Sequence, residues 1–469
     1  MWDFERFADS SAVIDDCGKT YSYSALAADG SALAAAIGTR CLVFSLCRSE
    51  IGSVLGYTAF LNHRIVPVLL NAHLDHALLD KLLTQYRPSY LWAPAEQAGE
   101  FPRMDTVYAA HDYCLLKTNY ETRYPLHGDL ALLLTTSGST GSPKFVRQSY
   151  ENIRANTASI IEYLKLDSTE RPITTLPMNY TYGLSIINTH LAVGATILLT
   201  EKTLMHKEFW SFFKEQGATS FGGVPYTYEM LDKLRFTRME LPSLRAMTQA
   251  GGKLTPDLHE KFAKYARETG KRFFVMYGQC EATARMGYLP PEKAVEKKGS
   301  MGIPIPGGRF CLIDGNGDEV TAPHSTGELV YEGANVTLGY AECGKDLAKG
   351  DERNGVLHTG DMAQFDEDGF YYIVGRKKRF LKLYGNRVNL DEAERLIKGE
   401  FGGIDCACGG IDDHMMIFVT DGALAEPVRD FAARKTGIHS AAFRSVVLKE
   451  IPKNDSGKTL YRDLEQYYG

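Results

Sequence analysis

LALLLTTSGSTGSPK, residues 130–144, is the strongest single signal in the sequence. Its apolar first half, followed by turn-forming residues, predicts a strand buried on both faces. Its second half is dense in hydroxyls and glycines, whose O–H and N–H groups can surround phosphate oxygens, and Lys144 adds a positive charge. The G-x-x-x-x-G-K-[ST] spacing of a Walker loop is absent. Composition alone therefore fits a flexible linker as well as a phosphate-binding loop.

Apolar runs of the same kind lie on both sides of this stretch, with helical patterns between them. They are CLVFSL (41–46), IVPVLL (65–70), TILLT (196–200) and RFFVMYG (272–278). The alternation predicts an α/β fold with parallel strands buried between layers of helices. From 308 to 376 the pattern changes to short strands joined by Asn-Gly and Asp-Gly turns, which is typical of antiparallel hairpins.

The chain has 469 residues, which is too long for one small core. The basic stretch 375–379 precedes a segment large enough to have its own core. In that segment Asn389, with Glu392 three residues later, predicts a helix start with a capping box. Pro427 and Gly437 bracket a second helix. We predict a large composite domain over 1–376, made of layered sheets plus a small antiparallel β-barrel-like part. A small, mobile α+β domain over 377–469 follows it.

Several function classes are disfavoured. The net charge of -6 and the lack of a basic domain argue against a nucleic-acid partner. No apolar run reaches the roughly 18 residues that would cross a membrane. The amino terminus carries acidic residues and no apolar segment, unlike a secretory signal. The nine cysteines are scattered, which predicts free thiols and a cytoplasmic protein.

Two metal-site patterns are rejected. Residues 314–318 resemble the start of a calcium loop, but Ser325 stands where the bidentate Glu belongs and the sixth position is not Gly. This segment is predicted to be a hairpin turn. His190, His358 and His414 lie far apart in the sequence, without the spacing of metal ligands.

Six further segments follow the 136–144 loop along the chain. They are PMNYTYG (177–183), YGQCE (277–281), GEL (327–329), TGD (359–361), GR (375–376) and SGK (456–458). With this set the chain resembles the adenylate-forming superfamily of acyl- and aryl-CoA ligases, adenylation domains and luciferases. The resemblance covers residue 130 to the end.

The resemblance implies a reaction in two halves. A carboxylate attacks the α-phosphorus of ATP to give an acyl-adenylate and pyrophosphate, and a thiol then takes the acyl group. ATP, Mg²⁺ and CoA or a phosphopantetheine thiol are the implied cofactors. The metal ion is needed because the carboxylate anion approaches a polyanion, and positive charge reduces their repulsion. The implied partners are a small carboxylic acid and, for a phosphopantetheine acceptor, a carrier protein.

The resemblance also assigns roles to single residues. Lys458 would bridge the attacking carboxylate and the phosphate, and Glu281 would be catalytic as the Mg²⁺ ligand. Tyr277 would stack on adenine, while Asp361 and Arg376 would hold the ribose. The implied nucleotide-binding set is Thr136, Ser137, Gly138, Ser139, Thr140, Gly141, Lys144, Gly252, Tyr277, Gly278, Cys280, Asp361 and Arg376.

Two more residues take roles in the thiol-transfer half. Lys378 falls at the family's hinge, where rotation of the small domain would exchange Lys458 for a thiol tunnel. Gly385 would face the thiol arm, where a side chain would block it. The other members of the basic stretch, Lys377 and Arg379, are interpreted as a solvated basic run.

The acid pocket is assigned to Tyr180 as the gate and to a surrounding set that includes Thr181, Tyr182, Gly222, Gly223, Val224, Tyr226 and Gly251. Domains that bind α-amino acids place an Asp after the gate aromatic, and Thr181 offers no such countercharge. An acyl, hydroxy-acyl or aryl acid is therefore favoured. Arg285 either pairs with a second acid group of the substrate or lies at the surface, and the surface position is favoured.

Three departures from the family pattern bear on activity. Cys280 replaces a Thr and is a weaker hydrogen-bond donor; Phe145 replaces a Gly, and Tyr150 a His. Three alternatives to an acid–thiol ligase stay open. They are adenylation that ends at an amine or at oxidation, an amino-acid adenylation domain, and a non-catalytic nucleotide-binding relative.

Overall fold

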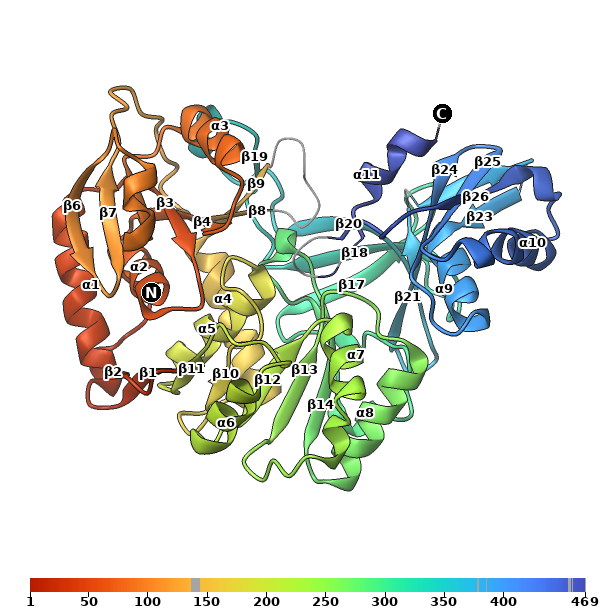
Figure 1. Ribbon diagram of the computed structural model, residues 1–469, viewed down its shortest axis with the longest axis horizontal. Helices are drawn as coiled ribbons and strands as arrows, with labels where there is room; N and C mark the ends of the chain where they lie inside the picture. Colours follow the sequence, from red (N-terminus) through yellow and green to blue (C-terminus); the bar gives the residue numbers. More distant parts are fainter. Residues whose placement is uncertain (136–143, 378, 385, 454–456, 458, 469) are drawn as a thin grey trace. The chain divides into compact units, whose positions relative to one another are not determined.

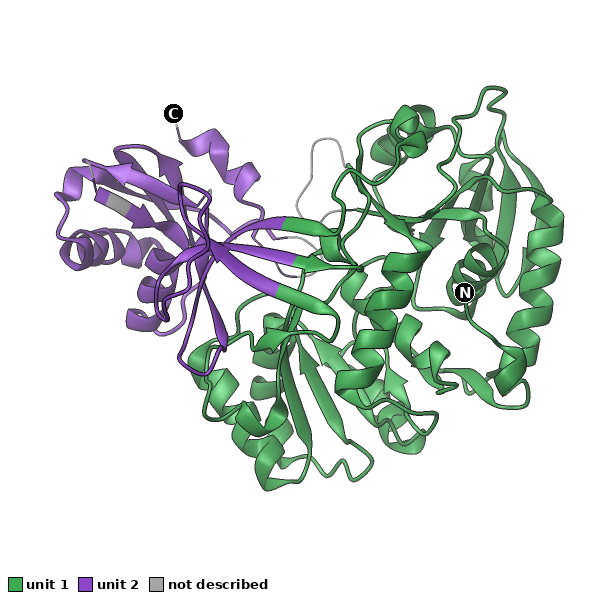
Figure 2. Cartoon of the chain, turned by 180° about the vertical axis from the view of Figure 1, so that it is seen from behind, with its two compact units in different colours: residues 1–309, 332–357 green, residues 310–331, 358–469 purple. Residues whose placement is uncertain are grey.

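The structure, a computed structural model, describes residues 1–135, 144–377, 379–384, 386–453, 457 and 459–468. The chain forms two compact units: 1–309 with 332–357, and 310–331 with 358–469 (Figure 2). The division runs through the hairpin segment, so parts of that segment group with the carboxy-terminal residues. The predicted domain boundary after Arg376 stays a prediction. No helix among the described residues is both long and apolar enough to span a bilayer.

An eight-stranded sheet in the first unit contains the opening stretch. Its order is β19-β9-β8-β4-β3-β5-β7-β6 (Figure 1). The strands are β3 Leu42–Cys47, β4 Val66–Asn71, β5 Tyr90–Pro94, β6 Asp105–Ala110, β7 Tyr113–Lys117, β8 Leu130–Thr135, β9 Phe145–Ser149 and β19 Gly339–Ala341. The central strands β5, β3, β4 and β8 run parallel, as their continuous apolar sequences predict. The sheet ends in antiparallel pairs, β8 with β9 and β5 with β7.

A nine-stranded sheet forms the other half of this unit, in the order β16-β15-β14-β13-β12-β10-β11-β1-β2. Its strands are β1 Ser11–Asp15, β2 Thr20–Ser22, β10 Pro172–Ile173, β11 Ile197–Leu199, β12 Ser220–Gly223, β13 Ala246–Gln249, β14 Arg272–Tyr277, β15 Gly287–Leu289 and β16 Ile303–Pro304. The six central strands, β14, β13, β12, β10, β11 and β1, pair in parallel. Strand β2 at one edge and strands β15 and β16 at the other pair antiparallel. All five apolar runs are therefore strands.

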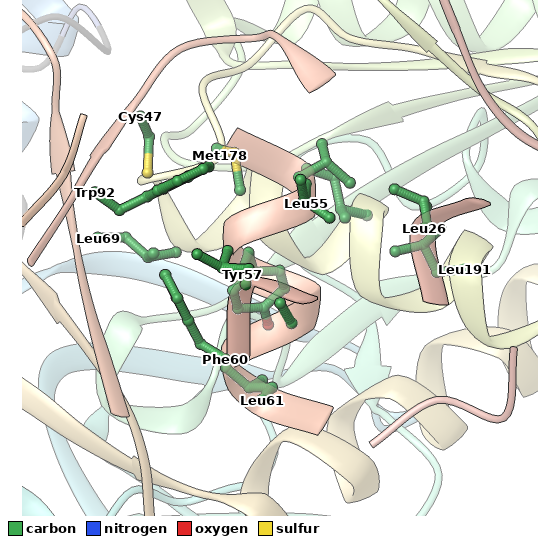
Figure 3. Close-up of a cluster of buried hydrophobic side chains, with 14 of the residues drawn as sticks. Leu26, Cys47, Leu55, Tyr57, Phe60, Leu61, Leu69, Trp92, Met178 and Leu191 are labelled. Atoms are coloured by element: carbon green, nitrogen blue, oxygen red, sulfur yellow. The ribbon is translucent and has the colours of Figure 1, made fainter. Parts of the chain in front are cut away.

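Helices cover these sheets. They are α1 Tyr23–Ile37, α2 Ile51–Asn62, α3 His76–Tyr86, α4 Tyr150–Leu164, α5 Thr181–Ala192, α6 Lys207–Glu215, α7 Pro225–Lys233 and α8 Pro256–Glu268. In Figure 1, α7 and α8 pack on β12 and β14. Every residue of α2 from Ile51 to Leu61 is buried. Figure 3 shows its side chains, Tyr57 and Phe60 among them, in a core that also takes in Met178 and Leu191 of the α5 region.

The second unit holds most of a four-stranded sheet, ordered β17-β18-β20-β21, and two small sheets. The strands are β17 Gly308–Ile313, β18 Gly327–Gly333, β20 Val356–Phe365, β21 Tyr371–Arg376, β22 Phe380–Leu383, β23 Asn386–Asn389, β24 Cys406–Ile411, β25 His414–Val419 and β26 Phe443–Val447. Helices α9 Leu390–Glu400 and α10 Ala425–Thr436 pack on β24 and β26, and α11 spans Tyr461–Leu464. This α+β arrangement agrees with the prediction.

Two local predictions can be checked at single residues. The Asn389 side chain accepts hydrogen bonds from the backbone of Asp391 and Glu392, so it is the N-cap of α9. The Glu392 carboxylate binds Arg395 instead of returning to the cap. The Asp314 carboxylate accepts from the backbone N–H groups of residues 316 and 318, so this segment is the predicted turn.

Candidate active site

Several predicted site residues lie outside the described residues: Thr136, Ser137, Gly138, Ser139, Thr140, Gly141, Lys378, Gly385 and Lys458. Their assigned roles stay predictions. The two ends of the 136–143 segment are described. Thr135 ends β8 and pairs across the antiparallel ladder with Phe145, the first residue of β9. The predicted phosphate loop therefore connects two adjacent strands.

The YGQCE segment follows β14 and makes a tight turn. A Cβ at Gly278 would lie 1.5 Å from the Ala284 carbonyl oxygen, so only glycine fits this backbone path. The turn continues through Thr283, which has a φ of 56°. The Cys280 thiol lies 3.6 Å from the Thr135 carbonyl oxygen at the end of β8. The structure thus brings YGQCE to the edge of the predicted phosphate loop.

Tyr340 is the centre of a charged cluster in the first unit. Its hydroxyl donates a 2.7 Å hydrogen bond to Glu281 Oε1. Lys144 Nζ lies 3.6 Å and Arg353 Cζ 4.7 Å from the centroid of its ring. Burial, followed by the adjacent Glu281 carboxylate, raises the pKa of Tyr340 above its usual range. Two predicted residues, Lys144 and Glu281, therefore meet on one aromatic side chain.

The backbone of Glu281 is fixed as firmly as its side chain. Its carbonyl oxygen accepts hydrogen bonds from the Thr337 backbone and hydroxyl, each 3.0 Å, and from Arg353 Nη1 at 3.2 Å. Tyr340 and Arg353 were not predicted from the sequence. Both lie outside the quoted motifs, and nothing in their local sequence marks them as neighbours of Glu281.

The residues around Glu281 fit the Mg²⁺ that the family implies. Mg²⁺ prefers one or two carboxylates together with substrate phosphates and water, rather than a cage of protein ligands. Glu281 supplies one half-buried carboxylate, oriented by Tyr340. Across the described residues, no group of three or more His, Cys, Asp or Glu side chains could hold a metal by itself. A metal that arrives with ATP matches this donor set.

The predicted acid pocket is built from two tyrosines against two glycines. A Cβ at Gly251 would lie 2.7 Å from the Tyr180 hydroxyl, and a Cβ at Gly222 would lie 3.0 Å from the Tyr182 hydroxyl. The centroids of the Tyr180 and Tyr182 rings lie 6.3 Å apart. The Tyr182 hydroxyl shares a 2.7 Å hydrogen bond with Thr248, and burial raises its pKa to about 12. The glycines therefore make room for both rings.

The other predicted pocket residues surround this pair. Thr181 is the first residue of α5 and is buried, as are Gly223, the last residue of β12, and Val224, which precedes α7. A Cβ at Gly251 would also lie 3.0 Å from a methyl group of Val224. Tyr226 is 55% exposed, unlike the half-buried Tyr180 and the buried Tyr182, and Gly252 is also exposed.

Arg285 is not at the surface, so the favoured interpretation is wrong. It is 1% exposed, and its Cζ lies 4.3 Å from the centroid of the Tyr182 ring. The reason is the turn after Glu281: Thr283 and Ala284 both have positive φ, which reverses the chain and carries residue 285 inward before β15. Charge and position in the sequence gave no sign of this turn.

The predicted ribose-binding pair belongs to the second unit. Asp361 and Arg376 are opposite each other in the β20–β21 ladder, and Arg376 Nε lies 3.1 Å from Asp361 Oδ1. Asp361 is 4% exposed, while the Arg376 side chain is 62% exposed. The Thr359 hydroxyl accepts from the Asp361 N–H and donates to the Leu329 carbonyl. The TGD segment is thereby tied to GEL on the neighbouring strand.

The basic stretch is not simply solvated. Lys377 Nζ lies 2.7 Å from the buried Glu328 carboxylate. Arg379 is mostly buried and binds Asp391 at 2.7 Å and Glu394 at 2.5 Å, with Tyr461 stacked against it. The Lys377 side chain is 58% exposed, so it is paired and still solvated. The interpretation as a solvated residue is wrong for Arg379, because its acidic partners on α9 and the Tyr461 ring cover it.

Phe145 and Tyr150 are part of the core. Phe145 is fully buried, with its ring 4.8 Å from that of Tyr86. Strand alternation turns it to the face opposite its neighbour Lys144. Tyr150 is also buried and lies under the Arg64 guanidinium at 4.8 Å. These two departures from the family pattern therefore fill hydrophobic core.

Comparison with known proteins agrees with this geometry. The family model described as "AMP-binding enzyme" matches residues 2–341. Oxalate–CoA ligase of Arabidopsis thaliana is 27% identical over 72% of this chain and 68% of that protein. Peroxisomal OPC-8:0-CoA ligase 1 of the same plant is 29% identical over 72% of this chain and 64% of that protein. The chain thus matches about two thirds of the length of these relatives.

The fold also matches a solved structure. The o-succinylbenzoate CoA synthetase MenE from Bacillus subtilis, in complex with the acyl-adenylate intermediate OSB-AMP, superposes with a TM-score of 0.77. The match covers 97% of this chain and 95% of that chain at 22% identity, a level at which the likeness concerns the fold. The match of the family model over most of the sequence decides the assignment, and the chain belongs to the family of AMP-binding enzymes.

Proposed function

We propose that this chain activates a small carboxylic acid with ATP, releases pyrophosphate, and transfers the acyl group from the adenylate to a thiol. The observation that carries this proposal is the cluster of Glu281, Tyr340 and Lys144 at the edge of the β8–β9 connection. It provides one oriented carboxylate and positive charge beside a segment rich in hydroxyls. The relatives are named as CoA ligases, which supports the same reaction class.

The first half-reaction needs charge neutralisation. A carboxylate oxygen of the acid attacks the α-phosphorus of ATP, a new O–P bond forms, and the bond to pyrophosphate breaks. Mg²⁺ bound with ATP would neutralise part of the phosphate charge. Glu281 would hold this ion, and Tyr340 orients its carboxylate by bonding Oε1. Lys144 and Arg353 add positive charge on the same ring, and Lys458 is proposed to bridge the acid and the phosphate.

The acid binds beside Tyr180 and Tyr182. Their rings occupy the space over Gly251 and Gly222, which favours a compact acid over a long aliphatic chain. Thr181 contributes a hydroxyl where an α-ammonium would need a carboxylate, so α-amino acids are disfavoured. In the second unit, Asp361 and Arg376 are proposed to bind the ribose.

The second half-reaction passes the acyl group to sulfur. A thiolate attacks the acyl carbonyl, and the bond to AMP breaks. CoA is the proposed acceptor, since the relatives are CoA ligases. A carrier-protein phosphopantetheine is the second candidate. Lys378 is proposed as the hinge and Gly385 as the residue beside the thiol arm. All nine cysteines are free, which supports a reducing compartment such as the cytoplasm.

Pyrophosphate release across a panel of acids, with ATP and Mg²⁺, tests the proposal. Thioester formation is then measured with CoA and with a holo-carrier protein. We expect acid-dependent pyrophosphate release and a thioester with CoA. Adenylate formation without a thioester to either thiol would replace the transfer half with an amine acceptor or oxidation. Absence of pyrophosphate with every acid would leave a nucleotide-binding protein without turnover.

A further inference from the structure

Arg285 holds a buried positive charge among neutral groups. Its Nη1 donates to the Tyr163 hydroxyl at 3.2 Å and lies 2.6 Å from the Met276 sulfur. Its Nη2 donates to the Ser185 hydroxyl at 3.0 Å. The Tyr182 ring covers one face of the guanidinium. Two hydroxyls, a thioether and an aromatic ring do not neutralise a full charge that water cannot reach.

No carboxylate of the described residues lies within ion-pair distance of Arg285. Its Nε is buried and has no hydrogen-bond partner within this described part. The buried Arg147 and the mostly buried Arg379 differ in this respect. Arg147 binds Glu352, and Arg379 binds Asp391 and Glu394. Because a guanidinium has five donors and no acceptor, Arg285 keeps a positive charge and an Nε donor that the described residues do not match.

Two further polar atoms near this site are buried without partners in the described structure: His190 Nε2 and Ser159 Oγ. Ser159 lies on the face of α4 that faces Arg285. On that face, Asn156 donates to the Arg285 carbonyl and Tyr163 accepts from its side chain. Burial, and to a smaller extent the charge of Arg285, lowers the pKa of His190 to about 4. Unpaired donors and acceptors in one buried region are typical of a place that a polar ligand or water completes.

The position of Arg285 relates it to the acid pocket. The Tyr182 ring lies against the guanidinium, while the Tyr182 hydroxyl lies over Gly222 in the pocket wall. Tyr182 therefore touches both the pocket and the cation. The guanidinium is therefore separated from the predicted pocket wall by one side chain.

We propose that Arg285 receives a second carboxylate at the far end of the substrate, so that this chain activates a short dicarboxylic acid. The inference rests on the proposed function, because it specifies the acid for that reaction. A carboxylate can accept two parallel hydrogen bonds from one guanidinium, which is the geometry that Arg favours. Arg285 acts on the substrate end remote from the chemistry, so it sets substrate choice and takes no part in bond making.

Matched acids and matched variants test this inference. Each diacid is paired with the monoacid of equal length, such as succinate with butyrate and adipate with hexanoate, and pyrophosphate release gives kcat/KM. For the wild type we expect the preferred diacid to exceed its monoacid roughly a hundredfold. Arg285→Met removes the charge and keeps an apolar stem, so the preference should vanish, mainly through KM. Arg272→Met is the control, because Arg272 starts β14, the strand that also carries Met276, and its side chain donates to the Leu164 carbonyl instead of contacting Tyr182.

Binding is measured separately from turnover. Isothermal titration of the diacid and its monoacid into the wild type, Ser185→Ala and Arg285→Met should show diacid binding that weakens stepwise in the variants. Ser185→Ala removes a neutral hydrogen-bond acceptor and keeps the charge, so it reports on the site if Arg285→Met does not fold. The inference is overturned if the wild type binds and turns over the monoacids as well as, or better than, the matching diacids. That result leaves the proposed function standing. Absence of pyrophosphate with all acids overturns the proposed function, and the titration then decides the inference alone.

Discussion

Gly278 shows how strictly one residue of the YGQCE segment is determined. Its Cα faces the Ala284 carbonyl oxygen so closely that any side chain meets backbone, which cannot yield by rotating. Gly278→Ala should therefore lower the free energy of unfolding by about 3 kcal/mol, as overpacking does, and weaken ATP binding. Urea unfolding and nucleotide titration measure the two effects. Gly99→Ala is the control, because a Cβ at Gly99 would have no atom within 4 Å, and no change is expected.

Tyr340 offers a test of how Glu281 is held. Tyr340→Phe removes the hydroxyl that binds Glu281 and keeps the ring beneath Lys144 and Arg353. We expect kcat for pyrophosphate release to fall roughly tenfold, the loss of about one hydrogen bond to a charged group, and the Mg²⁺ requirement to rise. Tyr340→Ala removes the ring as well and should lower kcat further. Equal kinetics for Tyr340→Phe and the wild type would remove Tyr340 from the proposed mechanism.

At the scale of elements, the apolar runs were predictable because a strand buried on both faces has a continuous apolar sequence. The runs at 65–70 and 130–136 became the adjacent parallel strands β4 and β8 for this reason. The turn at 283–284 was not predictable, since neither Thr nor Ala is a usual residue at positive φ. Arg285 was misplaced as a result, and Arg379 was misread because its partners come from α9.

Arg379 tests the small α+β region. It binds Glu394, which is nearly buried, and Arg379→Met would leave that carboxylate without its cation. We expect a loss of about 3–5 kcal/mol in the free energy of unfolding of this region, measured by urea unfolding followed by circular dichroism. Arg395→Met is the matched control on α9. Its pair with Glu392 is solvent-exposed, so the expected loss is within about 1 kcal/mol.

For the whole molecule, acid sensitivity follows from His190. Burial lowers its pKa to about 4 in the folded protein, below the ordinary value near 6.5 of an unfolded chain. As pH falls, the unfolded state binds the proton before the folded state does. The contribution of neutral His190 to the free energy of unfolding is therefore complete above about pH 6.5 and is lost as pH falls toward 4. Linkage sets its upper limit at about 3 kcal/mol. His190→Asn keeps a donor for the Ile186 carbonyl and should flatten the unfolding free energy between pH 7 and 4.5.

The architecture and the reaction class could be predicted from the sequence, because short motifs in a fixed order carry both. The environment of the site could not. Tyr340 and Arg353 reach Glu281 from segments about 59 and 72 residues later, and Arg285 turns inward through two unusual backbone angles. Contacts of this kind depend on tertiary packing, which a motif does not record.

Helix α2 bears on how the chain is made on the ribosome. Residues Ile51–Leu61 are all buried, and part of their cover is α5, which ends at Ala192. From residue 61 to residue 192 the ribosome adds 131 residues (192 − 61), which takes on the order of ten seconds. During that interval the apolar side chains of α2 that pack on α5 in the folded protein stay exposed. Translation speed over this interval and chaperones that shelter apolar segments are therefore expected to set the yield of folded protein.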